Sequence, residues 1–197
     1  ANIPLVVVSR NIAAGKKLAY VGCDDTEIGR LAGEYIAKRL GGKGNVVLIM
    51  GQLGASTTIG RTQGFEEVIA RYPDIKIVAK QTANYQRAMA LDAMQNILQA
   101  NPKIDAVFAQ NDEMAGGVAE ALRAAGRQGV VLVGVMAMKE ALERIAQGTQ
   151  DATVTFPPDT GKEGLKIGLA YLRGEKYVTE LSLPVQIVTK ENLDKFI

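Results

Sequence analysis

Short apolar runs alternate with longer segments of mixed polarity along the whole chain. Apolar runs at 5–8 and 18–22 precede a segment, 28–40, whose apolar residues recur with the period of a helix. The run NVVLIM at 45–50 is almost entirely apolar, as in a strand buried on both faces of a parallel sheet. Each apolar run is therefore predicted to be a strand, and 28–40 a helix.

The same alternation continues to the C-terminus. The pattern predicts strands at 75–79, 106–109, 130–135, 152–155 and 183–188, and helices at 56–72, 86–100, 112–125, 139–147 and 160–173, with a short helical tail. Gly or Pro follows most of the predicted helices. Repeated strand–helix alternation is typical of βαβ crossovers, so the sequence predicts an α/β fold with a doubly wound parallel sheet.

Composition agrees with a folded globular protein and excludes several classes of site. Of 197 residues, 22% are charged and 47% apolar, which excludes a disordered chain. The 23 basic and 21 acidic residues form no basic cluster, which argues against nucleic-acid binding. There is no histidine, and Cys23 is the single cysteine, so His-based catalytic triads, intrachain disulfides and multi-cysteine zinc sites are excluded. The sequence predicts no cofactor and no metal.

Neither a membrane span nor a signal peptide is visible in the sequence. No apolar run approaches the roughly 20 residues that cross a bilayer. The start of the chain, ANIP, lacks the basic residues and apolar core of a signal peptide.

The glycine-containing turn 51–57 follows a predicted strand and opens a helix. It lacks the lysine of a phosphate-binding loop, and is interpreted as a tight turn with a Ser/Thr helix cap. A helix N-terminus at the carboxyl end of a strand nevertheless suits a polar ligand. Arg61 lies in this helix and Arg10 follows the first strand. Each is either a solvated surface residue or a planar fork of donors for adjacent hydroxyls.

Polar residues also follow the predicted strand 106–109. Asn111 is either a helix cap or an amide that donates to and accepts from a sugar hydroxyl. Asp112 and Glu113 are neighbours on a helix and do not face each other, which argues against a glycosidase pair. Tyr85 either stacks on a ligand or belongs to the core.

Three stretches of the chain resemble the ribose- and sugar-binding periplasmic proteins, the type I solute receptors of ABC transporters. They are AVFAQNDEMAGG at 106–117, IPLVVVSRNI at 3–12 and GQLGASTTIGRTQGF at 51–65. The resemblance covers essentially the whole chain. The sugar-sensing core of LacI-type repressors shares this fold, but the chain has no helix-turn-helix segment and no basic region.

The resemblance implies a non-enzymatic, periplasmic protein that binds a ribose-like monosaccharide between two lobes joined by three hinge strands, and that delivers it to a membrane permease. It divides the chain into 1–18, a remnant of the first lobe and first hinge; 19–156, the second lobe; and 157–197, a helix returning to the first lobe with a closing hinge strand and tail. We therefore expect a truncated receptor or an isolated lobe.

The resemblance also assigns site residues. Arg10, Arg61 and Asn111 match positions that hydrogen-bond sugar hydroxyls, and Tyr85 matches an aromatic pocket position.

Three positions depart from the family pattern. Ser9 replaces an Asp, Met136 replaces the Asp of a Gly-aromatic-Asp motif, and Phe156 replaces a Gln or Asn. Carboxylates are the strongest acceptors for sugar hydroxyls, so this more apolar pocket predicts weakened or lost sugar binding.

Two alternatives remain. The first is a scaffold that self-associates, most simply as a two-fold dimer through the face bearing Tyr85, Met136, Met138 and Phe156, or that binds a more apolar ligand. An enzyme of a related doubly wound fold is disfavoured because the chain lacks histidine, a usable nucleophile and a phosphate loop.

Overall fold

The computed structural model describes residues 3–197 and divides the chain into two compact units. The smaller unit takes in the chain up to Asp24 together with Phe156–Val185, and the larger one takes in Asp25–Thr155 and Gln186–Ile197. The expected segments 1–18, 19–156 and 157–197 differ from this division, because residues 19–24 group with the smaller unit and residues 186–197 with the larger one. Residues 1 and 2 of the first segment lie outside the described residues.

The larger unit is built on a six-stranded sheet in the order β4-β3-β5-β6-β7-β9. Its strands are β3 (Lys43–Met50), β4 (Asp74–Thr82), β5 (Ala106–Ala109), β6 (Val131–Met136), β7 (Ala152–Thr155) and β9 (Ile187–Thr189). All neighbours pair in parallel except β9, which is antiparallel to β7. The predicted doubly wound parallel sheet is confirmed, with one antiparallel edge strand added.

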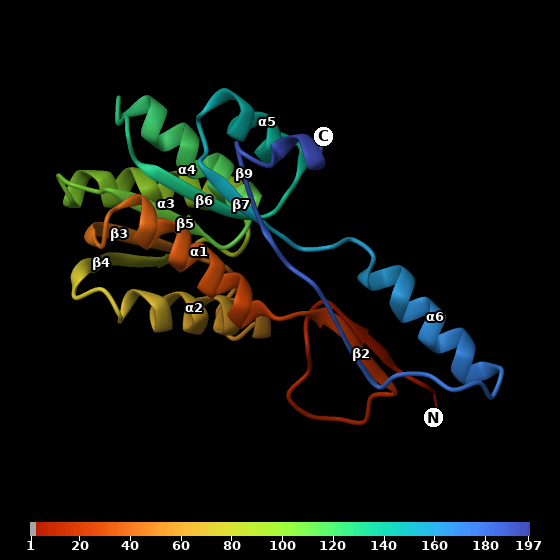
Figure 1. The fold of residues 1–197 in the computed structure, drawn as a ribbon. Coiled ribbons are helices and arrows are strands. Elements are labelled where there is room, and N and C mark those ends of the chain that lie inside the picture. Colours follow the sequence, from red (N-terminus) through yellow and green to blue (C-terminus); the bar gives the residue numbers. More distant parts are fainter. Residues whose placement is uncertain (1–2) are drawn as a thin grey trace. The chain divides into compact units, whose positions relative to one another are not determined.

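Helices cover both faces of this sheet (Figure 1). They are α1 (Asp25–Arg39), α2 (Ser56–Ile69), α3 (Arg87–Ala100), α4 (Asp112–Ala124) and α5 (Lys139–Gln147). The helices α1 and α2 pack together on one face, and α3 and α4 on the other, with α5 beside α4. A Cβ added at Gly64 would overlap the carbonyl oxygen of Thr26, and one at Gly117 would overlap that of Arg87. Glycine thus permits the close approach within each helix pair.

The central strand β5 is apolar and buried at every position because both of its faces are covered. In β5, Val107 packs into the cluster formed with α3 and α4, where Met94 and Met114 are fully buried. The next residue, Phe108, stacks at 5.1 Å on the ring of Phe65 from α2. Successive side chains of a strand point to opposite faces, so each strand residue contributes to one of two cores.

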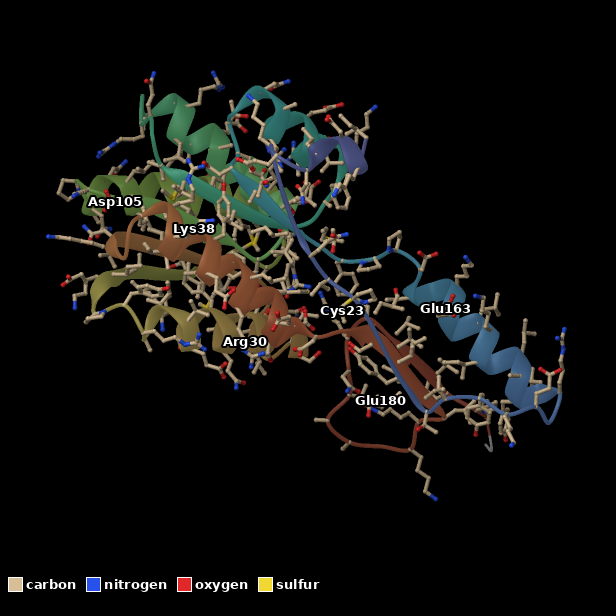
Figure 2. All side chains as sticks on the ribbon, viewed as in Figure 1. Cys23, Arg30, Lys38, Asp105, Glu163 and Glu180 are labelled. Atoms are coloured by element: carbon tan, nitrogen blue, oxygen red, sulfur yellow. The ribbon has the colours of Figure 1, made fainter. Side chains whose placement is uncertain are left out.

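The smaller unit is a three-stranded parallel sheet, β1 (Val6–Val8), β2 (Ala19–Cys23) and β8 (Glu180–Leu183), with α6 (Thr160–Leu172) packed on it. Cys23 ends β2 and is buried, and Glu163 lies on α6 (Figure 2). Ile167 joins the small core of this unit. Leu165, Leu169 and Leu172 recur at helical spacing on α6 and are exposed.

The single strand predicted at 183–188 is wrong. The structure has two strands there, β8 in the smaller sheet and β9 (Ile187–Thr189) in the larger one. Pro184 lies between them, and proline cannot donate to a strand ladder. The predicted helical tail is a 3₁₀ turn at Leu193–Lys195. Among residues 3–197, no helix combines the length and apolarity needed to cross a bilayer.

Candidate functional site

The carboxyl ends of the parallel strands bring the predicted site residues of the larger unit to one edge of the sheet. At this edge β3 and β5 are neighbours, but the chain leaves them toward opposite faces, through α2 and α4. Such a switch point is where open α/β sheets bind ligands. The Gly51 amide, just after β3, donates to Gln110 Oε1, just after β5, at 3.0 Å. The two strand ends are thereby joined.

Gln110 is fully buried and connects α2 to this edge. Its Nε2 donates to the Thr62 hydroxyl at 2.8 Å and to the Thr58 carbonyl at 3.4 Å. A buried amide with its donors and acceptor engaged holds its neighbours in one geometry.

Arg61 is buried rather than solvated, so the surface interpretation is wrong for this residue. Its Nε donates to Asp25 Oδ1 at 2.9 Å and its Nη1 to the carbonyl of Gln110 at 2.5 Å. Burial of a guanidinium requires such compensation, and the two contacts fix the plane of the fork at the switch point.

Tyr85 is half-buried and follows β4. Its hydroxyl lies 2.7 Å from the hydroxyls of both Thr57 and Thr58, in the first turn of α2. A Cβ at Gly51 would overlap the Tyr85 ring, so the glycine makes room for it. The predicted Ser/Thr cap of α2 is wrong: Ala55 is the N-cap residue and no side chain caps the helix.

Asn111 is the N-cap of α4, as one of the two interpretations predicted. Its Oδ1 accepts from the Met114 amide at 2.8 Å, and its Nδ2 donates to the carbonyl of Tyr85 at 3.3 Å. The side chain therefore both starts the helix and fixes the turn after β4. Both roles orient it at the edge where the resemblance placed a sugar-binding amide.

Asp112 is a buried carboxylate that the sequence analysis considered only as half of a catalytic pair. Its Oδ2 accepts from the Met138 amide at 2.9 Å, and its Oδ1 from the Thr153 hydroxyl at 2.8 Å. Burial raises the pKa of Asp112 from 3.8 to about 6, against the lowering effect of these hydrogen bonds. The sequence did contain a signal for the burial of Asp112: this residue lies on the same helical stripe as Ala115 and Leu122, which are both buried.

Backbone strain gathers in three turns that carry predicted site residues. Among the described residues, the non-glycine residues with positive φ are Ser9 at 66°, Asn84 at 51°, Tyr85 at 63°, Met136 at 116° and Ala137 at 54°. Each such residue costs on the order of 1–3 kcal/mol, and strain of this kind clusters at ligand-binding sites. Three of the five are residues that the resemblance had assigned to the pocket.

The remaining predicted residues belong to the smaller unit. Ser9 follows β1, and its carbonyl accepts from the Tyr20 hydroxyl at 2.9 Å. Arg10 is exposed and its amide donates to the carbonyl of Val8 at 2.9 Å. Phe156 is half-buried and directly follows β7. Over residues 3–197, no three His, Cys, Asp or Glu side chains are grouped as a metal site requires.

The chain is similar in sequence to proteins named for the sugars and polyols they bind. It is 37% identical to a xylitol-binding protein of Mycolicibacterium smegmatis over 98% of its own length and 56% of that protein. It is 34% identical to a ribose import binding protein of Escherichia coli, over 97% of the chain and 64% of that protein. The chain thus spans about 60% of the length of these relatives.

Solved structures give the same result. The fructose-binding periplasmic domain of a hybrid two-component system matches 98% of the chain with a TM-score of 0.95 and 37% identity, and the match covers 66% of that domain. An ABC transporter solute-binding protein from Actinobacillus succinogenes with bound D-allose matches 98% of the chain with a TM-score of 0.94 and 32% identity, over 72% of that protein. These proteins are named for what they bind and not for a reaction, in agreement with the expectation of a non-enzymatic receptor. Residues 1–176 match the periplasmic binding protein domain, and the chain belongs to this family.

Proposed function

We propose that this chain is the greater part of a periplasmic receptor for a ribose-like monosaccharide, which serves an ABC importer. One observation carries the proposal: at the switch point of the larger sheet, Arg61, Tyr85 and Asn111 are each fixed by buried or partly buried hydrogen bonds. The ligands named for its relatives, ribose, xylitol, fructose and D-allose, all carry several hydroxyl groups.

The chemistry of these side chains suits hydroxyl-rich ligands. A guanidinium presents a fork of donors, and a carboxamide both donates and accepts, as a hydroxyl does. Because the fork and the amide are oriented before the ligand arrives, binding does not have to order them. We assign the same role to Arg10 of the smaller unit, which resembles a sugar-binding position.

We further propose that ribose binding is weakened in this chain. Ser9, Met136 and Phe156 stand where the family pattern has two carboxylates and an amide. The Met136 side chain ends β6 and is 42% exposed at the proposed ligand-binding edge, where a thioether offers only a weak acceptor. Loss of two hydrogen bonds to charged acceptors removes about 3–6 kcal/mol of binding free energy.

Calorimetric titration with ribose, xylitol and D-allose tests this function. We expect ribose to bind more weakly than micromolar, and the double variant Ser9→Asp with Met136→Asp to gain detectable pentose binding. Aspartate suits position 9, where φ is 66°, because it tolerates the left-handed region better than most residues. The variant Gln95→Asp with Gln99→Asp, on the exposed side of α3, matches the charge change and should gain nothing.

Two results would contradict the proposal. A micromolar or tighter ribose constant in the unmodified chain would overturn the weakened binding. Absence of binding for all three ligands in both the unmodified chain and the double aspartate variant would overturn the receptor function.

Self-association is a second candidate function, supported by the apolar residues on α6. Leu165 and Leu172 are 65% and 73% exposed and lie on the same face as Leu169, and the three-residue strand β1 is an edge of its sheet. We propose a two-fold dimer of this chain. The second candidate interface is the edge of the larger unit that carries the exposed Met136 and Met138 and the half-buried Tyr85. Phe156, the fourth residue of the face named from the sequence, belongs to the smaller unit.

Sedimentation equilibrium tests the dimer and identifies its interface. We expect the unmodified chain to be a dimer. The double variant Leu165→Glu with Leu172→Glu should dissociate it, and the matched control Met136→Gln with Met138→Gln should leave it intact. Dissociation by the methionine pair alone would place the interface at the other face. A monomer at millimolar concentration would remove this candidate.

A further inference from the structure

The turn between β6 and α5, Met136–Met138, has a backbone that needs support. Met136 and Ala137 are consecutive non-glycine residues with φ values of 116° and 54°. Both conformations are unfavourable for residues with a side chain, and they persist only where the surroundings fix them.

Two consecutive amides of this turn are held by one pair of buried side chains. The Ala137 amide donates to the Thr153 hydroxyl at 3.3 Å, and the Met138 amide donates to Asp112 Oδ2 at 2.9 Å. The Thr153 hydroxyl in turn donates to Asp112 Oδ1 at 2.8 Å. Both side chains are at most 1% exposed. We call Asp112 and Thr153 the turn anchor.

The fold holds the anchor itself in place. Gln150 Nε2 approaches Asp112 Oδ1 at 3.4 Å, and Arg144 donates to the Asp112 carbonyl at 3.0 Å and to Gln150 Oε1 at 2.9 Å. A Cβ at Gly134 would overlap Asp112 Oδ1, so this glycine of β6 leaves room for the carboxylate. The anchor is thus held by Arg144 of α5 and by Gln150, which lies between α5 and β7, and β6 leaves space for it.

We propose that Asp112 and Thr153 are positioning residues, which fix the backbone of Met136–Met138 and thereby the direction in which Met136 is presented at the edge of the sheet. The effect on a bound sugar rests on the function proposed above. The effect on the turn does not, and it can be measured without any ligand.

Amide hydrogen exchange of the whole chain, followed by NMR, tests the anchor. Thr153→Val keeps the shape of the side chain and removes the hydroxyl, whereas Thr153→Ser keeps the hydroxyl. We expect Thr153→Val to raise the exchange rate of the Ala137 amide about tenfold, because this amide loses its acceptor, and to raise that of the Met138 amide less, because its acceptor Asp112 remains. Thr153→Ser should leave both near the unmodified rates. The Leu132 amide, which donates to Asp151 at the other end of β6, is the internal control.

A pH titration of the unmodified chain gives a second readout that needs no variant. Protonation makes Asp112 a weaker acceptor, so the Met138 amide shift should titrate with a midpoint of about 6. The charged groups around the anchor are Arg144 and Glu140 of α5, Glu113 of α4 and Arg87 of α3. Arg87 pairs with both Glu113 and Glu140, and this pairing holds the pKa of Glu140 below its usual value. Asp112→Asn should abolish the midpoint near 6.

The outcomes separate the anchor from the sugar site. Unchanged exchange at both amides in Thr153→Val would overturn the anchor, and so would a Met138 amide shift whose pH dependence is the same in Asp112→Asn as in the unmodified chain. For a sugar that binds, Thr153→Val should weaken affinity and Thr153→Ser restore it. If Thr153→Val and Thr153→Ser bind the sugar with equal affinity, although only Thr153→Val raises the amide exchange rates, the positioning role in sugar binding is overturned. Absence of sugar binding in both the unmodified chain and the variant Ser9→Asp with Met136→Asp would overturn the proposed function and leave the amide measurements valid.

Discussion

The buried pair of Arg61 and Asp25 gives the sharpest prediction for stability. Their side chains are 5% and 10% exposed and their charged atoms lie 2.9 Å apart. Arg61→Met leaves the Asp25 carboxylate buried without this counter-charge. Breaking a buried ion pair by removing one partner costs about 3–5 kcal/mol of unfolding free energy.

Guanidinium denaturation followed by far-ultraviolet circular dichroism measures this cost, because most of the helices belong to the larger unit. Arg30→Met is the matched control. Arg30 lies on α1 (Figure 2) and pairs with Glu67 at 3.1 Å, but the two side chains are 34% and 38% exposed. A partly exposed pair contributes at most about 1 kcal/mol, so the two arginine variants should differ by at least about 2 kcal/mol.

The double variant Arg61→Met with Asp25→Leu tests the reason for the loss. Removing both charges should recover much of the lost stability, because no carboxylate then remains buried at position 25. A cost below 1 kcal/mol for Arg61→Met, equal to that of Arg30→Met, would refute the reasoning. Arg61 would then be a solvated side chain, as its isolated place in the sequence suggested.

Three further changes have predicted outcomes. The pKa of Asp112 is about 6 in the folded state and 3.8 in the unfolded state, so folding favours its protonated form. The unfolding free energy should therefore fall by about 3 kcal/mol as the pH rises through that window. Urea titrations at stepped pH measure this fall, and Asp112→Asn should not show it. Gly64→Ala should lower the unfolding free energy by about 3 kcal/mol, because the added Cβ overlaps the Thr26 carbonyl. Gly161→Ala on α6, where the space is open, should raise it by about 0.5–1 kcal/mol, and urea denaturation measures both. Met136→Gly should raise the melting temperature through a net gain of about 0.5–2 kcal/mol, since glycine relieves the strain at φ 116°, and a lower melting temperature would contradict this.

The strands and helices were predictable because a strand buried on both faces consists of a continuous run of apolar residues, which is visible in the local sequence. The runs that became β3 and β5 are apolar at nearly every position, and this follows directly from helices on both sides of the sheet. The exception was the segment around Pro184. Of the residues predicted there, Leu183, Ile187 and Val188 lie in strands and residues 184–186 do not, because the division between two sheets depends on pairing partners more than 30 residues away in the chain.

The candidate site was only partly predictable, because its residues are held by distant contacts. The capping role of Asn111 lies within three residues of its own position and was foreseen. The burial of Arg61 depends on Asp25, 36 residues earlier, and the environment of Asp112 depends on Thr153, 41 residues later. Neither partner is marked by local spacing, and only the helical phase of Asp112 indicated that its carboxylate points inward.

The order in which the two units can fold follows from the strand pairing. In the larger unit, five parallel strands and their helices come from one continuous stretch, Asp25–Thr155, so they can assemble before the C-terminal residues take part. In the smaller unit, Tyr20 of β2 pairs with Glu180 of β8. Its sheet needs residues from almost the whole length of the chain, with a long loop to close, and it is the slower of the two to form. Until β8 arrives, β2 has one unpaired edge, and pairing of that edge with another chain is the main risk during folding.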